Sequence, residues 1–354
     1  MTLIDRYIFK TVILTALITL LVLLALESFF ALLTELDELG ERDYGFLAVL
    51  QYLLLTLPRR AYQTFPMVLL LGGLLGMGTL AGGSELVAMR AAGWSVLRLV
   101  GAALQAGLVL SLLALLLGEF VVPHAEQAAQ ELRTTARFGY DPTRPGRGFW
   151  ARDGDNFVNV GAVLPGVRLA DIYIYEVGEN SELNSVTRAQ EARYVDGHWL
   201  LEGVSRSAMQ PEGVAVDVLA TISWDSVISP AMLEVLATDP EDLSMRDLLT
   251  YIDYLKKNNL DASVYQLTFW LKAVAPLTNL AMLFIAMPFV FRPQRLGGVG
   301  QRLLIGILLG LTFFLVNQLL GNLVLFYGYH PLVGASLPTL AFFAGGAYAL
   351  SRVR

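Results

Sequence analysis

Six long apolar segments dominate this sequence, and they restrict the chain to a membrane fold. The segments cover residues 12–33, 65–81, 97–122, 266–291, 303–327 and 331–350. Each comes near the roughly 20 apolar residues that a helix needs to cross a bilayer core of about 30 Å. Of the 354 residues, 55% are hydrophobic and only 16% are charged, which is typical of membrane proteins. The sequence therefore predicts an α-helical membrane bundle of six transmembrane helices, with three on each side of a long insertion.

Two features of the first half need a separate interpretation. The first apolar segment is too long for a cleavable signal peptide and lacks a small-residue cleavage site, so we expect a retained helix. The apolar run Phe46–Leu57 ends at Pro58, and about a dozen residues cannot span a membrane. We expect this run to lie in the interface, with the second transmembrane helix beginning near Tyr62.

Lys and Arg residues in the short loops predict the orientation of the chain. With the N-terminus inside, the predicted cytoplasmic segments carry nine basic residues and two acidic ones. The whole chain has a formal charge of −6, so acidic residues gather on the other side, in the loop 35–43 and in the central insertion. Both termini are therefore predicted to be cytoplasmic.

The central insertion consists of short segments that alternate polar residues with β-branched or aromatic ones, separated by turn signals such as DGDN and PEG. An antiparallel sandwich or open roll is the expected fold. A helical extension of the third span is predicted at 126–138, and Ser244 and Asp247 are predicted to cap a helix that runs to Lys257. The predicted strands cover residues 156–160, 168–176, 188–195, 199–209 and 214–224.

These segments set the predicted domain boundaries. Residues 1–138 hold the first three spans, a short helix at about 84–93 and the helical extension. Residues 139–235 form the β-domain, and residues 236–264 form a helical connector. The last three spans occupy residues 265–354.

The connection between the second and third spans, SELVAMRAAGWS at 84–95, has the features of a short capped helix. Ser84 is the predicted N-cap, Glu85 suits the positive end of the helix dipole, and Gly93 stands where a left-handed residue ends a helix. A helix of barely two turns is unstable alone, so it must lie either on lipid headgroups or in a groove of a partner protein. Its predicted apolar face comprises Leu86, Val87 and Met89.

Catalytic chemistry has little support in the sequence. There are no cysteines, and His124, His198 and His330 are far apart in the chain. The run GGLLGMG at 72–78 lacks the lysine of a nucleotide-binding loop and lies in a span, where small residues serve close helix packing. We therefore expect no catalytic residue, metal or cofactor in this chain.

Several motifs together resemble the LptF/LptG family, the permease subunits of the lipopolysaccharide export transporter. The resemblance lies in the order and spacing of these motifs along both membrane halves, and IDRYI and SELV favour the LptG side of the family. The motifs are IDRYIFKT at 4–11, TFPM at 64–67, SELVAMRAAG at 84–93, PHAEQ at 123–127 and NQLLG to LP within 317–338.

The resemblance implies a multi-pass inner-membrane transporter subunit rather than an enzyme. Members of the family pair as an LptF–LptG heterodimer on a cytoplasmic LptB ATPase dimer, which binds ATP and Mg²⁺. They extract lipopolysaccharide from the inner membrane and pass it through periplasmic β-jellyroll domains towards LptC and LptA. The expected partners are thus an LptF-like permease, an LptB-like ATPase, LptC- and LptA-like proteins and lipopolysaccharide, with no nucleic acid.

The resemblance also suggests residues for three roles, with arginine favoured for phosphate because of its planar, bidentate geometry. The candidates for contact with the ATPase are Ser84, Glu85, Leu86, Met89 and Arg90. The candidates for lipid phosphates and sugars are Arg59, Arg60, Arg133, Arg137 and Lys272. The candidates for the acyl-chain cavity are Phe29, Phe30, Phe65, Leu69, Phe314 and Leu315.

Each assignment has a plainer alternative. Interfacial arginines often extend to solvent, Lys272 can do the same or pair with Glu27, and aromatic residues in a span often only meet lipid. The family leads us to expect a basic residue near the outer end of the first helix, where this chain is acidic instead. We interpret Glu35, Asp37 and Glu38 there as exposed loop acids, with divalent-cation binding as the alternative.

Two other functions fit the sequence pattern. One is a permease of a different ABC-type exporter, which moves proteins, peptides or another lipid. The other is a passive membrane scaffold whose external domain recruits partners. A capped helix on the cytoplasmic side favours a motor-driven permease, because a scaffold has no evident use for it.

Overall fold

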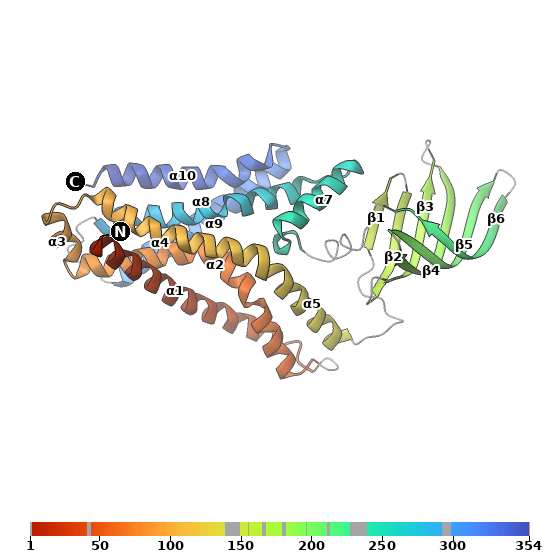
Figure 1. The fold of residues 1–354 in the computed structure, drawn as a ribbon, viewed down its shortest axis with the longest axis horizontal. Helices are drawn as coiled ribbons and strands as arrows, with labels where there is room; N and C mark the ends of the chain where they lie inside the picture. Colours follow the sequence, from red (N-terminus) through yellow and green to blue (C-terminus); the bar gives the residue numbers. More distant parts are fainter. Residues whose placement is uncertain are drawn as a thin grey trace. The chain divides into compact units, whose positions relative to one another are not determined.

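The chain folds into two compact units (Figure 1). The computed structural model describes residues 2–40, 44–138, 149–154, 156–164, 168–178, 182–195, 197–210, 213–226, 239–291 and 299–353. The helical unit comprises Met1–Arg137, Asp242–Leu248 and Ser263–Arg354. The β unit comprises Phe138–Glu241 and Leu249–Ala262.

Within the described residues, six helices are long and apolar enough to cross a membrane. The prediction of six apolar helices in two groups of three is confirmed, and so is the helical extension after the third. They are α1 (Leu3–Leu36), α2 (Phe46–Gly82), the continuous helix of α4 (Val96–Leu116), η1 (Leu117–Val121) and α5 (Val122–Phe138), α8 (Ser263–Phe291), α9 (Val299–Tyr327) and α10 (Pro331–Ser351). The segment η1 is a single π-helical turn.

The prediction of a separate interfacial run before α2 is wrong. Residues Phe46–Leu57 form the beginning of α2, which continues through Pro58 and Pro66. A proline removes one backbone hydrogen bond, and membrane helices tolerate this loss because neighbouring helices and hydroxyl side chains satisfy the freed groups. Pro58 therefore does not mark a helix end here.

Helix α2 is the central helix of the helical unit. In its most apolar stretch 67% of the residues are buried, compared with 22% for α1 and 17% for α9. Its glycines allow close approach: Thr15 Oγ1 donates to the Gly72 carbonyl at 2.8 Å, and a Cβ atom on Gly72 would lie 2.6 Å from Ala16 Cα. The predicted packing role of the glycine-rich run is thereby confirmed.

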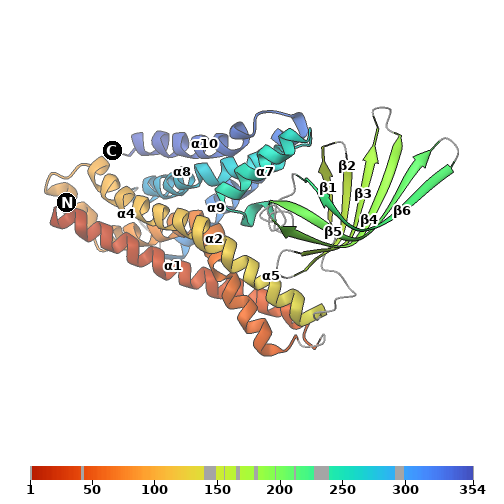
Figure 2. The same cartoon turned by 45° about the vertical axis from the view of Figure 1, so that its right-hand side comes forward.

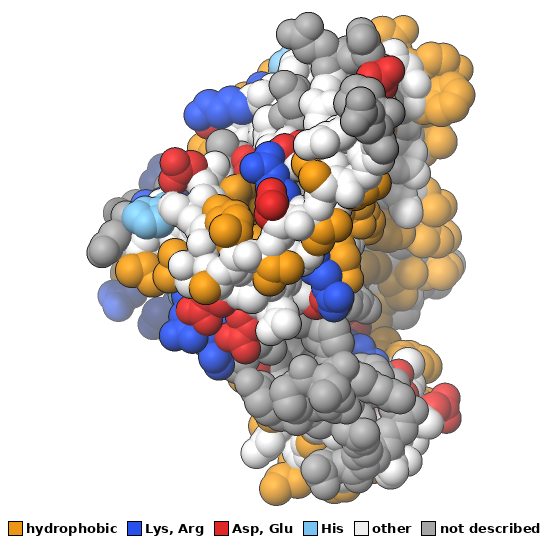
Figure 3. All heavy atoms as spheres, turned by 90° about the vertical axis from the view of Figure 1, so that its right-hand side faces the viewer, with side chains coloured by type: hydrophobic (Ala, Val, Ile, Leu, Met, Phe, Trp, Pro, Cys, Tyr) orange, Lys and Arg blue, Asp and Glu red, His pale blue; other side chains and the backbone are white. Residues whose placement is uncertain are grey.

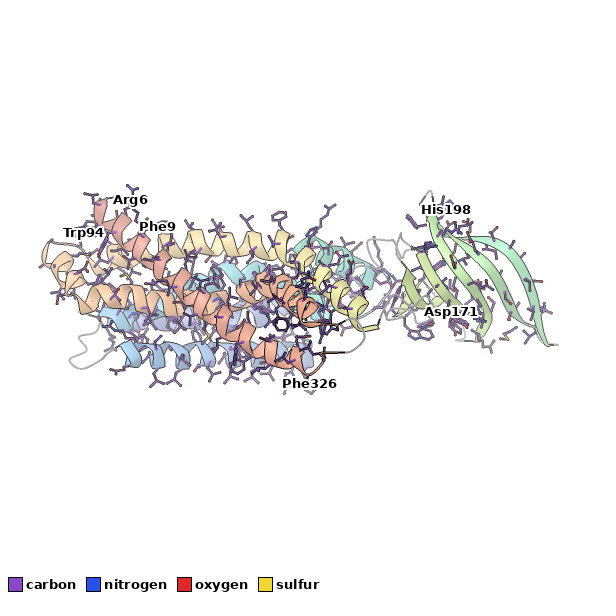
Figure 4. The ribbon with its side chains drawn as sticks, turned by 90° about the horizontal axis from the view of Figure 1, so that it is seen from below. Arg6, Phe9, Trp94, Asp171, His198 and Phe326 are labelled. Carbon is purple, nitrogen blue, oxygen red and sulfur yellow. The ribbon has the colours of Figure 1, made fainter. Side chains whose placement is uncertain are left out.

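Helix α3 (Glu85–Ala91) and both chain termini lie at the same end of the helical bundle (Figures 1 and 2). We call this end the α3 end. Figure 4 places Arg6 and Trp94 there and Phe326 of α9 towards the opposite end. This arrangement agrees with the predicted topology, in which the termini and the short helix share one side of the membrane.

The β unit contains one six-stranded antiparallel sheet whose strands follow the order of the chain. The predicted antiparallel insertion is confirmed, and Figure 2 shows that the sheet is twisted and curved. In each strand every second residue tends to face the buried core of the sheet, for example Val158, Ile172 and Leu201. The fully buried Trp199 belongs to the same core. The strands are β1 (Phe149–Asp153), β2 (Asn156–Leu164), β3 (Arg168–Val177), β4 (Leu183–Val195), β5 (His198–Gln210) and β6 (Gly213–Trp224).

Helix α7 (Met245–Lys257) begins at the predicted cap. The Asp247 N–H donates to Ser244 Oγ at 3.1 Å, and the Ser244 hydroxyl donates to Asp247 Oδ2 at 2.6 Å. In the β unit, the Tyr254 hydroxyl donates to the Arg152 carbonyl of β1 at 2.6 Å. Burial raises the pKa of Tyr254, so the phenol keeps its proton and this bond at ordinary pH.

Ion pairs between neighbouring strands cover part of the sheet surface. Arg188 Nη2 lies 3.0 Å from Asp171 Oδ1, and Arg193 Nη2 lies 3.0 Å from Glu202 Oε2. Figure 3 shows acidic and basic side chains interspersed on the visible face. Exposed pairs of this kind contribute little to stability, so the apolar core holds the β unit together.

Candidate functional site

Helix α3 ends as the sequence predicts but begins differently. Gly93 has a φ of +91°, the Gly93 N–H donates to the Arg90 carbonyl at 3.0 Å, and the Trp94 N–H donates to the Met89 carbonyl at 3.1 Å. These two bonds form a Schellman motif. The predicted N-cap is wrong, because Ser84 is left-handed (φ 59°) and its side chain makes no capping hydrogen bond. A capping side chain needs an extended backbone to reach the first helical N–H groups, and the tight turn after α2 does not provide one.

The two faces of α3 have different surroundings. Leu86 is only 3% exposed and packs into the core of the helical unit, so it is not available to a partner protein. Val87 is 65% exposed and Arg90 is also exposed. Consecutive helical residues point about 100° apart, so the prediction that Leu86 and Val87 share one apolar face is wrong. The accessible surface of α3 centres on Val87 and Arg90.

Contacts with α1 and α4 hold α3 in place. The Tyr7 hydroxyl of α1 lies near the Glu85 carboxylate. The Arg98 guanidinium of α4 lies 3.9 Å from the Trp94 ring centroid, and its Nε lies 3.9 Å from Asp5 Oδ1 of α1. A displacement of α3 therefore disturbs the beginnings of both helices.

Arg133 of α5 lies among acidic and aromatic side chains from α1, from the turn after α1 and from α2. Its Nη2 atom lies 2.7 Å from Glu38 Oε2 and 3.2 Å from Glu35 Oε1, and its guanidinium lies 5.2 Å from the Tyr52 ring centroid. Glu35 is 6% exposed and accepts a hydrogen bond from the Tyr44 hydroxyl at 2.7 Å. The interpretation of Glu35 and Glu38 as exposed loop acids is therefore wrong, because both neutralise Arg133.

Tyr44 is fully buried beside this ion pair. Burial, reinforced by the neighbouring Glu35 carboxylate, raises the pKa of Tyr44 above its usual range. The described residues contain no group of three or more His, Asp or Glu side chains that could hold a metal ion. The acidic residues at this place thus serve Arg133 and Tyr44.

Arg59 of α2 is also neutralised within the chain. Its Nε atom lies 3.2 Å from Glu126 Oε2 of α5, and its Nη1 atom lies 3.4 Å from Asp242 Oδ2 in the short helix η2 (Pro240–Asp242). Glu126 and Asp242 are 2% and 3% exposed. Buried carboxylates need a charge partner, so Arg59 neutralises Glu126 and Asp242 in this structure.

Lys272 of α8 also contacts groups within the chain. It is 6% exposed, its Nζ donates to the Leu243 carbonyl, and its Nζ lies 5.7 Å from the Tyr62 ring centroid. In the π turn η1, Glu119 Oε2 accepts a hydrogen bond from the Met245 N–H at 2.9 Å. A carboxylate at the first N–H of α7 also suits the positive end of the helix dipole.

The short segment 242–245 is therefore bound by side chains from three different helices. These side chains are Arg59, Glu119 and Lys272. We call these three side chains the segment clamp. The sequence predicts Arg59 and Lys272 to be lipid ligands, and in the structure both side chains make contacts within the chain. The sequence analysis predicted no role for Glu119, although an acidic residue inside an apolar span usually has a buried partner.

Arg60 differs from Arg59 and Lys272. It is half-buried, and it donates to Thr56 Oγ1 at 3.3 Å and to the Glu27 carbonyl at 3.5 Å, which are neutral acceptors. The Glu27 side chain is close enough for the Arg60 charge to act on it, so Glu27 has a cationic neighbour other than Lys272. The Arg137 side chain lies outside the described residues.

The six candidates for an acyl-chain cavity divide into two groups. Phe65 and Leu69 of α2 are 7% and 0% exposed and pack in the core of the helical unit. The other four lie on the exposed apolar surfaces of α1 and α9. They are Phe29, Phe30, Phe314 and Leu315, which are 56%, 58%, 61% and 56% exposed.

A hollow of about 280 Å³ lies between the last turns of α9 and the beginning of α10, and no sequence motif indicates it. Its walls are apolar. The lining residues are Leu320, Leu323, Val324, Tyr327, Tyr329, Val333, Gly334 and Leu337.

Six membrane-length helices, divided three and three by an antiparallel β unit, define a multi-pass membrane protein with an inserted extramembrane domain. The charged side chains of its helical unit serve internal contacts at several sites. The chain belongs to the lipopolysaccharide export system permease LptF/LptG family, whose family model matches residues 6–352. The resemblance found in the sequence motifs is thereby confirmed.

Curated relatives place the chain on the LptG side of this family. It is 36% identical over 351 residues to the lipopolysaccharide export system permease protein LptG of Escherichia coli strain K12, with 98% of each chain covered. It is 32% identical over 352 residues to LptG of Haemophilus influenzae, with 99% of this chain and 98% of the relative covered. Both similarities extend over the helical unit and the β unit.

Proposed function

We propose that this chain is the LptG-type permease subunit of an ATP-driven exporter of lipopolysaccharide in the bacterial inner membrane. The observation that carries this proposal is the 36% identity to an LptG protein along 98% of both chains. In this function the chain binds and guides the lipid and performs no chemistry on it. The β unit is periplasmic and passes lipopolysaccharide towards LptC- and LptA-like proteins, and both termini are cytoplasmic.

ATP and Mg²⁺ act in a separate LptB-like ATPase dimer, which contacts α3. The exposed Val87 and Arg90 supply the centre of that contact, with Glu85 and Met89 beside them. Leu86 fixes α3 to the bundle, so a push on the exposed side of α3 reaches the core of the helical unit. The Schellman motif keeps this short helix formed while it transmits the push.

An LptF-like permease packs against α9. Only 17% of the most apolar stretch of α9 is buried in this chain, and Gln318 and Asn322 lie exposed one helical turn apart. Amide side chains are costly in lipid and find hydrogen-bond partners at helix–helix interfaces. A second membrane subunit on this face satisfies both amides.

Lipid recognition divides between charged and apolar groups. Arg60 binds a lipid phosphate directly, because its hydrogen-bond acceptors are neutral. Arg133 binds one by exchanging the carboxylates of Glu35 and Glu38 for phosphate oxygens, and Arg137 lies one helical turn further along α5. The acyl chains lie against the exposed apolar residues of α1 and α9, which are Phe29, Phe30, Phe314 and Leu315.

Affinity purification of the tagged chain from its native membrane, followed by mass spectrometry of proteins and lipids, tests this function. We expect an ATPase, a second six-helix permease and bound lipopolysaccharide. Recovery of the ATPase with a different cargo would remove the substrate assignment. Recovery without any ATPase would support the scaffold alternative.

A further inference from the structure

Arg302, near the beginning of α9, contacts the end of α2 that leads into α3. Its Nη1 donates to the Gly78 carbonyl. A Cβ atom on Gly78 would lie 2.8 Å from Arg302 Nη1 and 3.0 Å from its Cδ, and one on Gly82 would lie 4.0 Å from Nη1. The Arg302 side chain therefore lies flat across the last turns of α2, in space that only a glycine leaves open.

The charge of Arg302 suits this position. The C-terminal end of a helix carries a partial negative charge, and the last turn of α2 has no basic residue of its own. Arg302 supplies the missing cation from a different helix. Three residues after Gly82, the chain enters α3 at Glu85.

The remaining contacts between α2 and this half of α9 are apolar. Gly306 and Gly310 follow Arg302 at intervals of four residues on the same helix face. A Cβ atom on Gly306 would lie 2.5 Å from Leu71 Cδ2, and one on Gly310 would lie 3.1 Å from Met67 Cε. These glycine contacts contain no hydrogen bond. Arg302 provides a polar contact that fixes the position of α9 along α2.

We propose that Arg302 is a positioning residue that makes this half of α9 follow the movements of α3. The proposal rests on the proposed function in one respect, because it requires an ATPase that moves α3. When α3 shifts, Gly78 shifts with it, and the bond to Arg302 carries the movement into α9. Helix α9 is the least buried of the six long helices in the described structure, and α10, which packs against it, moves with it.

The test uses the complete complex of this chain, its partner permease and the ATPase, in lipid nanodiscs that contain lipopolysaccharide. The chain has no cysteine, so spin labels can be placed cleanly at Leu304→Cys of α9 and Leu108→Cys of α4, which are 58% and 47% exposed. Two quantities are measured in each variant. They are the change in label distance on nucleotide binding and the amount of lipid released per ATP hydrolysed.

Arg302→Ala and Gly78→Ala break the contact from its two sides. Their matched controls are Gln301→Ala, an exposed neighbour, and Gly101→Ala, where a Cβ atom would meet nothing within 4 Å. We expect both test variants to assemble and hydrolyse ATP, to lose the nucleotide-dependent distance change, and to release about tenfold less lipid per ATP, a factor typical of allosteric coupling. Arg302→Lys, which keeps a charge and a donor, should recover part of both quantities.

Equal distance changes and equal release in Arg302→Ala and Gln301→Ala would overturn the proposal. A general loss of structure is recognised separately, because it would lower ATP hydrolysis and assembly as well. The distance change could be present in the wild-type complex and lost in Arg302→Ala while the wild-type complex releases no lipopolysaccharide. This result would contradict the proposed substrate and support the role of Arg302. The two failures are therefore distinguishable.

Discussion

Arg59 Nη1 lies 3.4 Å from Asp242 Oδ2, although the two residues are 183 positions apart in the sequence. Asp242 belongs to the segment that follows the β strands and leads back to the membrane helices. Glu119 and Lys272 hold the next residues of the same segment. The segment clamp thus fixes the point at which the chain re-enters the helical unit.

Replacing Arg59 by leucine should destabilise the protein strongly. The change removes the cation that pairs with the buried Glu126 carboxylate and breaks the pair with Asp242, and breaking a buried ion pair costs about 3–5 kcal/mol. The Arg59 side chain is 27% exposed, so we expect the lower part of this range. Thermal unfolding in detergent measures the effect. Lys257→Leu, which removes an exposed pair with Asp253, is the control, and an equal loss in both variants would contradict the role of Arg59.

Aspartate substitutions on the two faces of α3 should affect different properties, which are the stability of the chain and its binding of the ATPase. Leu86→Asp places an unpaired carboxylate in the apolar core and should lower the unfolding temperature of the chain. Val87→Asp lies in the exposed surface and should leave the unfolding temperature unchanged while it weakens ATPase binding. Both quantities are measured on the same preparations. Normal ATPase binding by Val87→Asp would exclude this face of α3 as the contact.

Neutralising Arg60 should reduce lipid binding without destabilising the chain. Its hydrogen bonds at 3.3 and 3.5 Å to neutral oxygens are long and contribute little. We expect Arg60→Gln to carry about tenfold less lipopolysaccharide through purification, because a charged hydrogen bond contributes about 1.5–3 kcal/mol. Arg60→Lys keeps the charge and should retain part of the lipid. Mass spectrometry measures the amount of lipopolysaccharide bound per protein. Equal amounts in Arg60→Gln and wild type would exclude Arg60 as a lipid ligand.

Tyr44 should make the stability of the helical unit depend on alkaline pH. Its pKa is raised in the folded protein above the unfolded value of about 10, so the folded state binds the proton more tightly. This contribution is fully present below pH 10 and falls by about 1.4 kcal/mol per unit as the pH rises further, until the folded pKa is reached. Unfolding temperatures between pH 8 and 11 should therefore fall more steeply for wild type than for Tyr44→Phe. Parallel curves would show that Tyr44 is not held in its neutral form.

The helices and strands could be predicted from the sequence because their signals are local. Apolar runs and the Ser244–Asp247 cap identify their elements without any distant contact. The exceptions were α2, where Pro58 looked like a helix end, and β1, whose five residues FWARD are too short and too charged to stand out. In both places a neighbouring element determines the structure.

The charged site residues could not be predicted for the same reason. Glu38 is 95 residues from Arg133, and Leu243 is 29 residues from Lys272. Sequence alone shows a cation near a membrane boundary and cannot show which carboxylate or carbonyl reaches it. A phosphate ligand and a buried ion pair use the same residue types, so the fold must decide between them.

The π turn at 117–121 has a consequence for insertions and deletions. A turn closed between residues five apart holds one residue more than an α-helical turn does over the same length. Removing one residue there restores a regular helix, so the helical phase on both sides of the turn is preserved. A one-residue deletion between the π turn and Glu126 instead rotates Glu126 and Arg133 away from their partners. Relatives whose helix is one residue shorter should therefore have the deletion at the π turn. Relatives that lack the π turn should also lack the Glu119 contact.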